Sequence, residues 1–172
     1  QMFTKSDSLI GNRATKKNLK DTDLTGYRHL VFATHGLLSG KVSGLMEPAL
    51  ALAREPGTKE RDGFLSLSEA MRLKLNADVV ALTACVTGLG KEVAGEGVMG
   101  MGRAFQYAGA KSVLVSLWSV SESSTTKLVS RFFTHLKAGT DKVKSLRTAR
   151  KEIRNAGFRH PFFWAPFILI GE

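Results

Sequence analysis

The chain has 172 residues, of which 43% are hydrophobic, and carries a net charge of +10 from 25 Lys and Arg against 15 Asp and Glu. That length suits a single domain with a sizeable core, and its apolar runs are far shorter than the about 20 residues that span a bilayer. A lone cysteine, Cys85, excludes an internal disulfide, and no secretory signal is visible, so we expect a cytoplasmic protein.

Apolar runs and turn residues predict the elements of the first half. We expect loosely held polar residues over 1–12, a helix over 13–20, a buried strand over 27–34, an extended segment over 49–53 and a mobile loop over 55–63. Ser66 and Glu69 have capping-box spacing, which predicts a helix that begins there and runs to about Leu75.

The second half continues the alternation of strands and helices. We expect a strand over 79–84, a glycine-rich loop to 95, a helix over 96–108, a strand over 112–120, helices over 123–137 and 141–156, and a last strand over 164–170. In the helix over 141–156 one face carries Val143, Leu146, Ala149, Arg150 and Ile153, and Lys and Arg fill the other. This alternation predicts a mainly parallel sheet with helices on both faces.

Two apolar runs end in side chains that can do chemistry. Leu30 to Thr34 is followed by His35, and Val79 to Ala84 is followed by Cys85. Sites in open α/β sheets lie at the carboxyl ends of the strands, so we expect the two side chains to share one site. A thiol and an imidazole are the partners that cysteine-nucleophile chemistry needs. They offer only two metal ligands without zinc-like spacing, so we expect no metal and no cofactor.

A set of short phrases, in this order and spacing, resembles the CHAT domain, a caspase-like family related to separase and the caspases. The phrases are Phe32-Ala33-Thr34-His35-Gly36, Asp62-Gly63-Phe64-Leu65-Ser66, Leu82-Thr83-Ala84-Cys85-Val86-Thr87-Gly88, Gly95-Glu96-Gly97, Arg103-Ala104-Phe105, Ala108-Gly109-Ala110, Ser116-Leu117-Trp118 and His160-Pro161-Phe162-Phe163-Trp164-Ala165-Pro166-Phe167. The match covers about Leu9 to Glu172. It implies a caspase-like three-layer α/β sandwich and a cysteine endopeptidase with His35 as catalytic histidine and Cys85 as nucleophile.

Peptide cleavage by this dyad assigns a role to each residue. Cys85 attacks the carbonyl, and His35 protonates the leaving nitrogen and later helps to activate water. The backbone N–H groups of Gly36 and Cys85 are the expected oxyanion donors, and one such donor contributes roughly 3 kcal/mol. Taken alone, Cys85 would be read as a small buried hydrophobe and His35 as a hydrogen-bonded loop residue. His160, which precedes Pro161, is expected to be structural.

Two positions depart from the pattern of the family. Val86 stands where an acid usually follows the nucleophile, and Ser121-Glu122 replaces the usual paired acids. The resemblance implies that Glu122 and Trp118 contribute to substrate binding, with lysine or arginine preferred before the scissile bond. Glu122 is read equally well as an acid that favours a helix N-terminus. The alternative function is a catalytically silent caspase-like module that serves as a scaffold.

The resemblance also bears on domain organisation and partners. Residues 1–172 look like the carboxyl-terminal part of a CHAT domain in a longer protein, with further strands upstream. Such domains act on a protein substrate and are switched by an attached repeat domain or another regulatory partner. We therefore expect activation by ordering of the glycine-rich loops over 37–63 and 86–95.

The basic charge permits other readings. Lys and Arg are densest over 13–20 and 142–154, but no aromatic residue interrupts these stretches to stack a base. We interpret them as solvated helix faces, with an acidic partner as the alternative, and expect neither nucleic acid nor membrane as a ligand. Residues 95–100 match the dinucleotide pattern G-x-G-x-x-G, but a long loop separates them from the preceding strand. We therefore expect those glycines to allow close helix packing.

Overall fold

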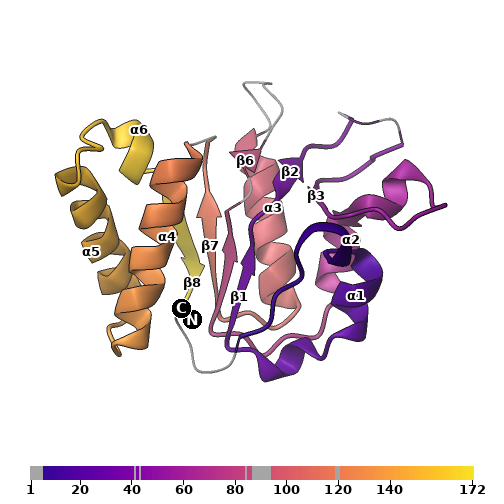
Figure 1. Ribbon diagram of the computed structural model, residues 1–172, viewed down its shortest axis with the longest axis horizontal. Coiled ribbons are helices and arrows are strands. Elements are labelled where there is room, and N and C mark those ends of the chain that lie inside the picture. The colour runs from indigo at the N-terminus through magenta and orange to yellow at the C-terminus, as the bar shows by residue number, and fades with distance from the viewer. Residues whose placement is uncertain (1–5, 41, 43, 84, 87–93, 119–120) are drawn as a thin grey trace. The chain divides into compact units, whose positions relative to one another are not determined.

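A computed structural model describes residues 6–172 except 41, 43, 84, 87–93 and 119–120 (Figure 1). The chain divides into two compact units. The first comprises Leu9–Trp118 with Leu169–Glu172, and the second comprises Ser119–Ile168 with the first eight residues.

The first unit alternates short helices and strands. Its elements are η1 (Gly11–Arg13), α1 (Lys16–Asp21), η2 (Leu24–Gly26), β1 (His29–Phe32), β2 (His35–Leu37), β3 (Ala49–Ala51), η3 (Glu60–Gly63), β4 (Phe64–Ser66), α2 (Leu67–Met71), β5 (Val79–Leu82), β6 (Cys85–Val86), α3 (Ala94–Tyr107) and β7 (Ser112–Ser116). The second unit contains α4 (Glu122–Lys137), α5 (Lys142–Asn155) and α6 (Pro161–Trp164), and β8 (Phe167–Gly171) crosses from the second unit to the first.

The main sheet has the strand order β1-β5-β7-β8. Its first three strands are parallel, as expected from the alternation of strands and helices. The end of β8 lies beside the start of β7, where the Glu172 N–H donates to the Lys111 carbonyl, and Figure 1 shows β8 pointing opposite to β7. β5 and β7 are buried along their whole length, because strands in the middle of a parallel sheet are covered on both faces.

The edge of this sheet departs from the prediction. β1 lies at the end of the strand order, and its Val31 is 50% exposed, so the strand expected to be buried over 27–34 is buried only in part.

The central strand β7 ends at Ser116 rather than at 120. There the Ser116 hydroxyl donates a 2.6 Å hydrogen bond to the Trp118 carbonyl, which turns the chain out of the strand.

A second, small sheet has the order β4-β3-β2-β6. β3 is antiparallel to both β2 and β4, and β2 is parallel to β6. Only the segment around β3 is predicted from the sequence, because runs of two or three residues are too short to show a period.

Helix α3 covers β7, and its glycines permit the close approach. A Cβ on Gly102 would come within 2.8 Å of Ile170, and one on Gly100 would come within 3.2 Å of Leu67 in α2. The G-x-G-x-x-G segment lies inside α3 rather than in a turn between a strand and a helix. The expected close packing is therefore confirmed at Gly100.

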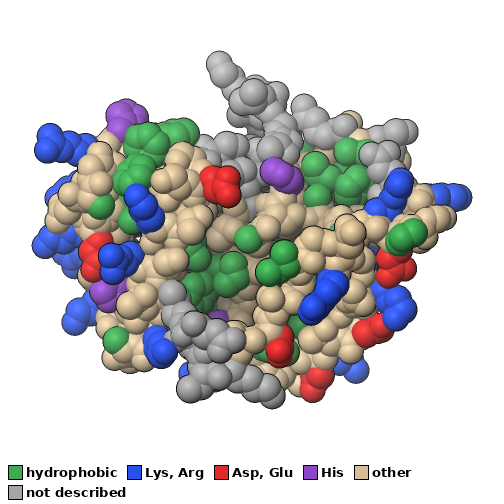
Figure 2. Space-filling model, viewed as in Figure 1, with side chains coloured by type: hydrophobic (Ala, Val, Ile, Leu, Met, Phe, Trp, Pro, Cys, Tyr) green, Lys and Arg blue, Asp and Glu red, His purple; other side chains and the backbone are tan. Residues whose placement is uncertain are grey.

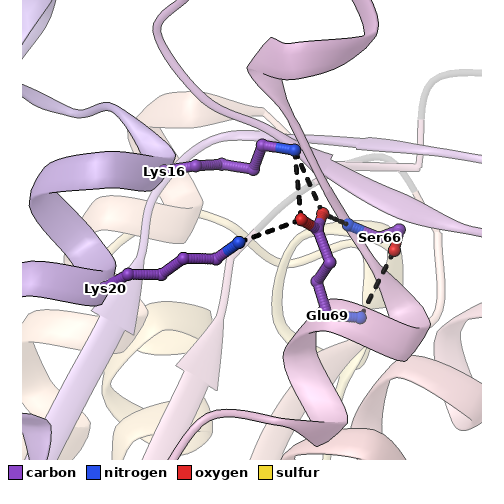
Figure 3. A network of polar contacts seen from close by, with 4 residues as sticks. All are labelled: Lys16, Lys20, Ser66 and Glu69. Carbon is purple, nitrogen blue, oxygen red and sulfur yellow. Dashed lines mark hydrogen bonds and ion pairs between the residues drawn. The ribbon is translucent and has the colours of Figure 1, made fainter.

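The capping box is confirmed, and Glu69 does more than cap (Figure 3). Its Oε2 accepts from the Ser66 N–H at 3.1 Å, while the Nζ atoms of Lys16 and Lys20, from α1, lie 3.2 and 3.1 Å from its Oε1. Burial alone would raise the pKa of Glu69, but the Ser66 N–H and the two lysines outweigh it and hold the pKa below its ordinary value. Glu69 thus ties α1 to α2.

The length of α2 is shorter than predicted. The helix ends at Met71 rather than near Leu75, because the N–H groups of Arg72 and Leu73 turn back to the carbonyls of Glu69 and Ala70.

In the second unit, α4 and α5 pack against each other. α5 buries Leu146, Ala149 and Ile153, as its pattern predicts. Val143 in the first turn of that helix is 70% exposed, so the prediction that it lies on the buried face is wrong.

His160 caps α6 by accepting from the Phe162 N–H at 3.2 Å, which confirms its structural role. The last strand begins at Phe167 because α6 occupies the residues before it.

Candidate functional site

His35 and Cys85 are partners in the parallel pair of β2 and β6. In the main sheet His29 pairs with Val79 and Phe32 with Leu82, an offset of 50 positions. The same offset pairs His35 with Cys85, so the small sheet continues the register of β1 and β5 beyond a short break (Figure 1). Paired positions on parallel strands lie on the same side of their sheet. The backbone therefore brings positions 35 and 85 together just beyond the carboxyl ends of β1 and β5.

The structure describes the imidazole of His35, but of Cys85 it describes only the backbone. His35 is exposed, and its imidazole makes no hydrogen bond with another described residue. The thiol of Cys85 and the side chain of Val86 lie outside the described part of the chain. Gly36 is buried, with Leu50 of β3 on one side and Val86 of β6 on the other.

Two threonines hold the strands at the break. The Thr83 N–H and hydroxyl both reach the Phe32 carbonyl, at 3.2 and 3.4 Å. The Thr34 hydroxyl donates to the carbonyl of Ala51 in β3. Sequence reasoning missed these contacts, although both phrases show a Thr shortly before the candidate residue: Thr34 directly before His35, and Thr83 two positions before Cys85.

Below the break, apolar packing fixes the strands. The rings of Phe32 in β1 and Phe105 in α3 lie 5.0 Å apart, and both side chains are buried. A pair of backbone positions at the end of such strands is therefore held by a rigid base.

The two expected substrate-binding residues belong to different units. Trp118 follows β7 in the first unit and is 37% exposed. Glu122 is the exposed first residue of α4 in the second unit, where the Ser121 side chain caps the helix by accepting from the Ser124 N–H at 3.4 Å. The backbone of β2 and β6 brings His35, Gly36 and Cys85 together. Glu122 lies in the second unit, at the start of α4.

The described acids whose pKa departs from its ordinary value lie outside β2 and β6. The hydrogen bond from Lys111 lowers the pKa of Asp78, and Arg28 adds to that effect against the opposing effect of burial. Among the described residues no group of three His, Cys, Asp or Glu side chains is placed to hold a metal ion. In the part of the chain that the structure describes, no helix is both long enough and apolar enough to cross a membrane.

A parallel strand pair that carries a histidine and a cysteine at partnered positions, next to a mainly parallel sheet, is what a caspase-like α/β domain leads us to expect. The comparison with protein families matches the CHAT domain over residues 1–172. The chain therefore belongs to the CHAT domain family, which confirms the resemblance found in the sequence.

Two curated proteins are similar to this chain, and both are called tetratricopeptide repeat protein 28. The protein from Mus musculus is 28% identical over 195 residues, covering 95% of this chain and 8% of the relative. The one from Homo sapiens is 34% identical over 110 residues, covering 63% of this chain and 4% of the relative. The chain thus spans less than a tenth of the length of either relative.

Proposed function

We propose that this CHAT domain is a cysteine endopeptidase in which His35 and Cys85 form the catalytic dyad. The observation that carries the proposal is the register of β2 with β6, which pairs the two residues. Both belong to the phrases that mark the family, and the match to the family covers the whole chain.

In the proposed reaction, the Cys85 thiol gives its proton to His35, and the thiolate attacks the peptide carbonyl carbon and forms a thioester as the carbon–nitrogen bond breaks. The His35 imidazolium gives its proton to the leaving amine. Water then adds to the thioester as His35 takes one of its protons, the carbon–sulfur bond breaks to release the acid product, and the His35 imidazolium returns the proton to restore the Cys85 thiol. The N–H groups of Gly36 and Cys85 would stabilise the oxyanion in both steps.

We place the preference for lysine or arginine before the scissile bond at Glu122, with Trp118 lining the substrate cleft. The exposure of Glu122 at the first position of α4 supports this assignment, since an exposed carboxylate is free to meet a cationic side chain. The proposal includes the finer architecture that the family implies, a three-layer sandwich with helices on both faces of the sheet.

We also propose that the domain cleaves a protein substrate in the cytoplasm under the control of an attached repeat domain or another partner. The relatives support this regulation, because they are named for tetratricopeptide repeats and are far longer than this chain. A reduced thiol fits a reducing compartment.

A catalytically silent scaffold remains the second candidate. Val86 and Ser121 favour it, because both replace acids that the family pattern usually carries. The position of Gly36 between two paired strands also favours it, because sheet pairing on both sides competes with an oxyanion for backbone groups.

The test is labelling of the chain by a peptidyl acyloxymethyl ketone with arginine next to the reactive group, followed by cleavage of a mixed peptide library. We expect the probe to attach at position 85, and both labelling and cleavage to be lost in Cys85→Ala. His35→Gln is the matched variant: it should lower cleavage by at least about 100-fold, the lower range for general acid–base catalysis.

The library should be repeated with the domain in the longer protein that contains it. Labelling without cleavage by the chain alone, and cleavage by the longer protein, would support control by an attached domain. An unlabelled Cys85 together with intact peptides in both forms would refute the endopeptidase and leave the scaffold.

A further inference from the structure

The positive charge of this chain is concentrated in its second unit. Residues 119–168 contain ten Lys and Arg but only three Asp and Glu, Glu122, Asp141 and Glu152. That stretch therefore carries +7 of the net charge of +10. Figure 2 shows Lys and Arg side chains over α4 and α5, and others over the part of the first unit with α1 and α2.

On α5 four of these cations form a single row: Lys144, Arg147, Lys151 and Arg154. Their spacing of three, four and three residues places them on one face of the helix, and all four are exposed. The row extends over about 15 Å of helix axis, at 1.5 Å per residue. The opposite face of the helix, with Leu146, Ala149 and Ile153, is buried. We call these four residues the cationic row.

No described carboxylate pairs with a side chain of the cationic row, and Asp141 at the start of α5 accepts only from the backbone N–H of Lys144. The only acid in α5 is Glu152, and it is turned toward α4, with its Oε1 3.0 Å from His135 Nε2 and its Oε2 3.6 Å from Arg131. Within the described part of the chain, no side chain of the cationic row makes an ion pair or a hydrogen bond. Like charges three or four residues apart destabilise a helix, so the arrangement opposes folding unless something else compensates.

In the first unit, neighbouring cations pair with a shared carboxylate. There Lys16 and Lys20 meet Glu69, and Arg28 and Lys111 meet Asp78. Clustered cations in this chain are therefore not always left to solvent, because in the first unit a carboxylate lies between them. The cationic row differs in having no such carboxylate among the described residues.

We infer that the cationic row docks an acidic helix of a protein partner, with carboxylates at the same spacing of three, four and three residues. The spacing reads the same in both directions, so the partner helix can run parallel or antiparallel to α5. This inference rests on the proposed regulation by a partner and assigns that partner a binding surface.

Two features of the row favour an acidic polypeptide over other anions. The row contains no aromatic side chain on which a base could stack, and the Asp141 carboxylate already occupies the N-terminus of α5, where a phosphate would otherwise bind. A membrane surface is disfavoured because the apolar face of α5 is buried against α4 and cannot insert into lipid.

The test uses a fluorescent alanine-based helical peptide with four Glu at the matching spacing, titrated into the full chain and followed by anisotropy. The control peptide has the same composition with its Glu distributed around the helix. In the row variant, Lys144, Arg147, Lys151 and Arg154 are all changed to Gln. The matched control variant changes two exposed Lys and two exposed Arg of the first unit, Arg54, Lys59, Lys74 and Arg103, to Gln.

We expect the row variant to bind the matching peptide at least about tenfold more weakly, and the control variant to bind within about twofold of the wild type. Affinity should fall as salt is added, because exposed ion pairs are screened. Cys85→Ala should bind as tightly as the wild type, so loss of catalysis and loss of docking are distinguishable.

Three results would overturn the inference. The control variant could lose as much affinity as the row variant, which would show bulk charge rather than a site. The control peptide could bind as tightly as the matching peptide, which would show that the spacing of the carboxylates does not determine binding. A DNA duplex or vesicles with phosphatidylserine could bind more tightly than the matching peptide through the same four residues, which would assign the row to phosphate.

Discussion

His35 of β2 and Cys85 of β6 are backbone partners at the same 50-residue offset that pairs His29 with Val79 in the main sheet. The two candidate residues therefore extend a ladder in which β5 is buried along its whole length. Neither short strand could hold such a register alone, since two or three residues offer few hydrogen bonds. Their juxtaposition depends on the strands below and on Thr34 and Thr83, which bridge the break.

Replacement of Glu69 by Gln should destabilise the first unit by about 1–2 kcal/mol. The variant keeps the shape of the side chain but removes the charge that Lys16 and Lys20 share, and charge-assisted hydrogen bonds are stronger than neutral ones. Urea unfolding would measure the loss. Lys17→Gln is the control, because its pair with Asp21 is exposed and solvent-screened, so its loss should leave the urea midpoint nearly unchanged. Equal effects in both variants would contradict a special role for Glu69.

Stability should fall in acid, and Glu69 and Asp78 should contribute to the fall. Both pKa values are lower in the folded protein than their ordinary values of 4.5 and 3.8. The unfolded chain therefore takes up protons first, so the stabilisation is complete above those values and is lost as the pH falls below them through the folded pKa values. Urea unfolding from neutral pH to about pH 3.5 should show a shallower decline in Glu69→Gln. An unchanged slope would show that Glu69 does not titrate differently on folding.

Gly109→Ala should destabilise the protein by more than about 3 kcal/mol. Gly109 has a φ of +113° at the end of α3, and a Cβ there would collide with the Leu75 carbonyl oxygen. Gly139, after α4, also has a positive φ of +82°, but no atom lies within 4 Å of its Cβ position. Gly139→Ala should therefore cost only about 1 kcal/mol of backbone strain. Thermal unfolding of the two variants compares collision with strain, and similar losses would contradict the close contact at Leu75.

Glu122→Gln should lower kcat/KM for substrates with arginine before the scissile bond by about tenfold, while Glu122→Asp retains most of the preference. The physical reason is loss of the carboxylate that meets the guanidinium in the proposed site. Both variants should unfold within about 1 kcal/mol of the wild type, because an acid in the first turn of a helix adds only that much. If Glu122→Gln loses stability but keeps the preference, Glu122 serves the α4 helix alone.

Local sequence patterns were enough to predict several elements. The capping box at Ser66 and Glu69 was confirmed, as were the long helices that became α3, α4 and α5, because caps and helical periods act over a few neighbouring residues. Val143 was predicted on the buried face of α5 and is exposed, because a period assigns a face but not how far along the helix the packing extends.

Other elements could not be read from local patterns. β2, β4 and β6 were missed because they are only two or three residues long. Val31 was expected to be buried, yet it is half exposed because β1 lies at the edge of the sheet, and the order of strands is a property of the whole chain.

The sequence by itself determined the family, through phrases spaced along nearly the whole chain, and it singled out His35 and Cys85 by their chemistry. Only the tertiary structure decided that these two residues are register partners, that Glu69 joins lysines about 50 residues away, and that Glu152 pairs with Arg131 and His135 of α4 rather than with the cationic row. Such pairings join distant parts of the chain. They are selected by which faces the fold buries together, and no local period records that choice.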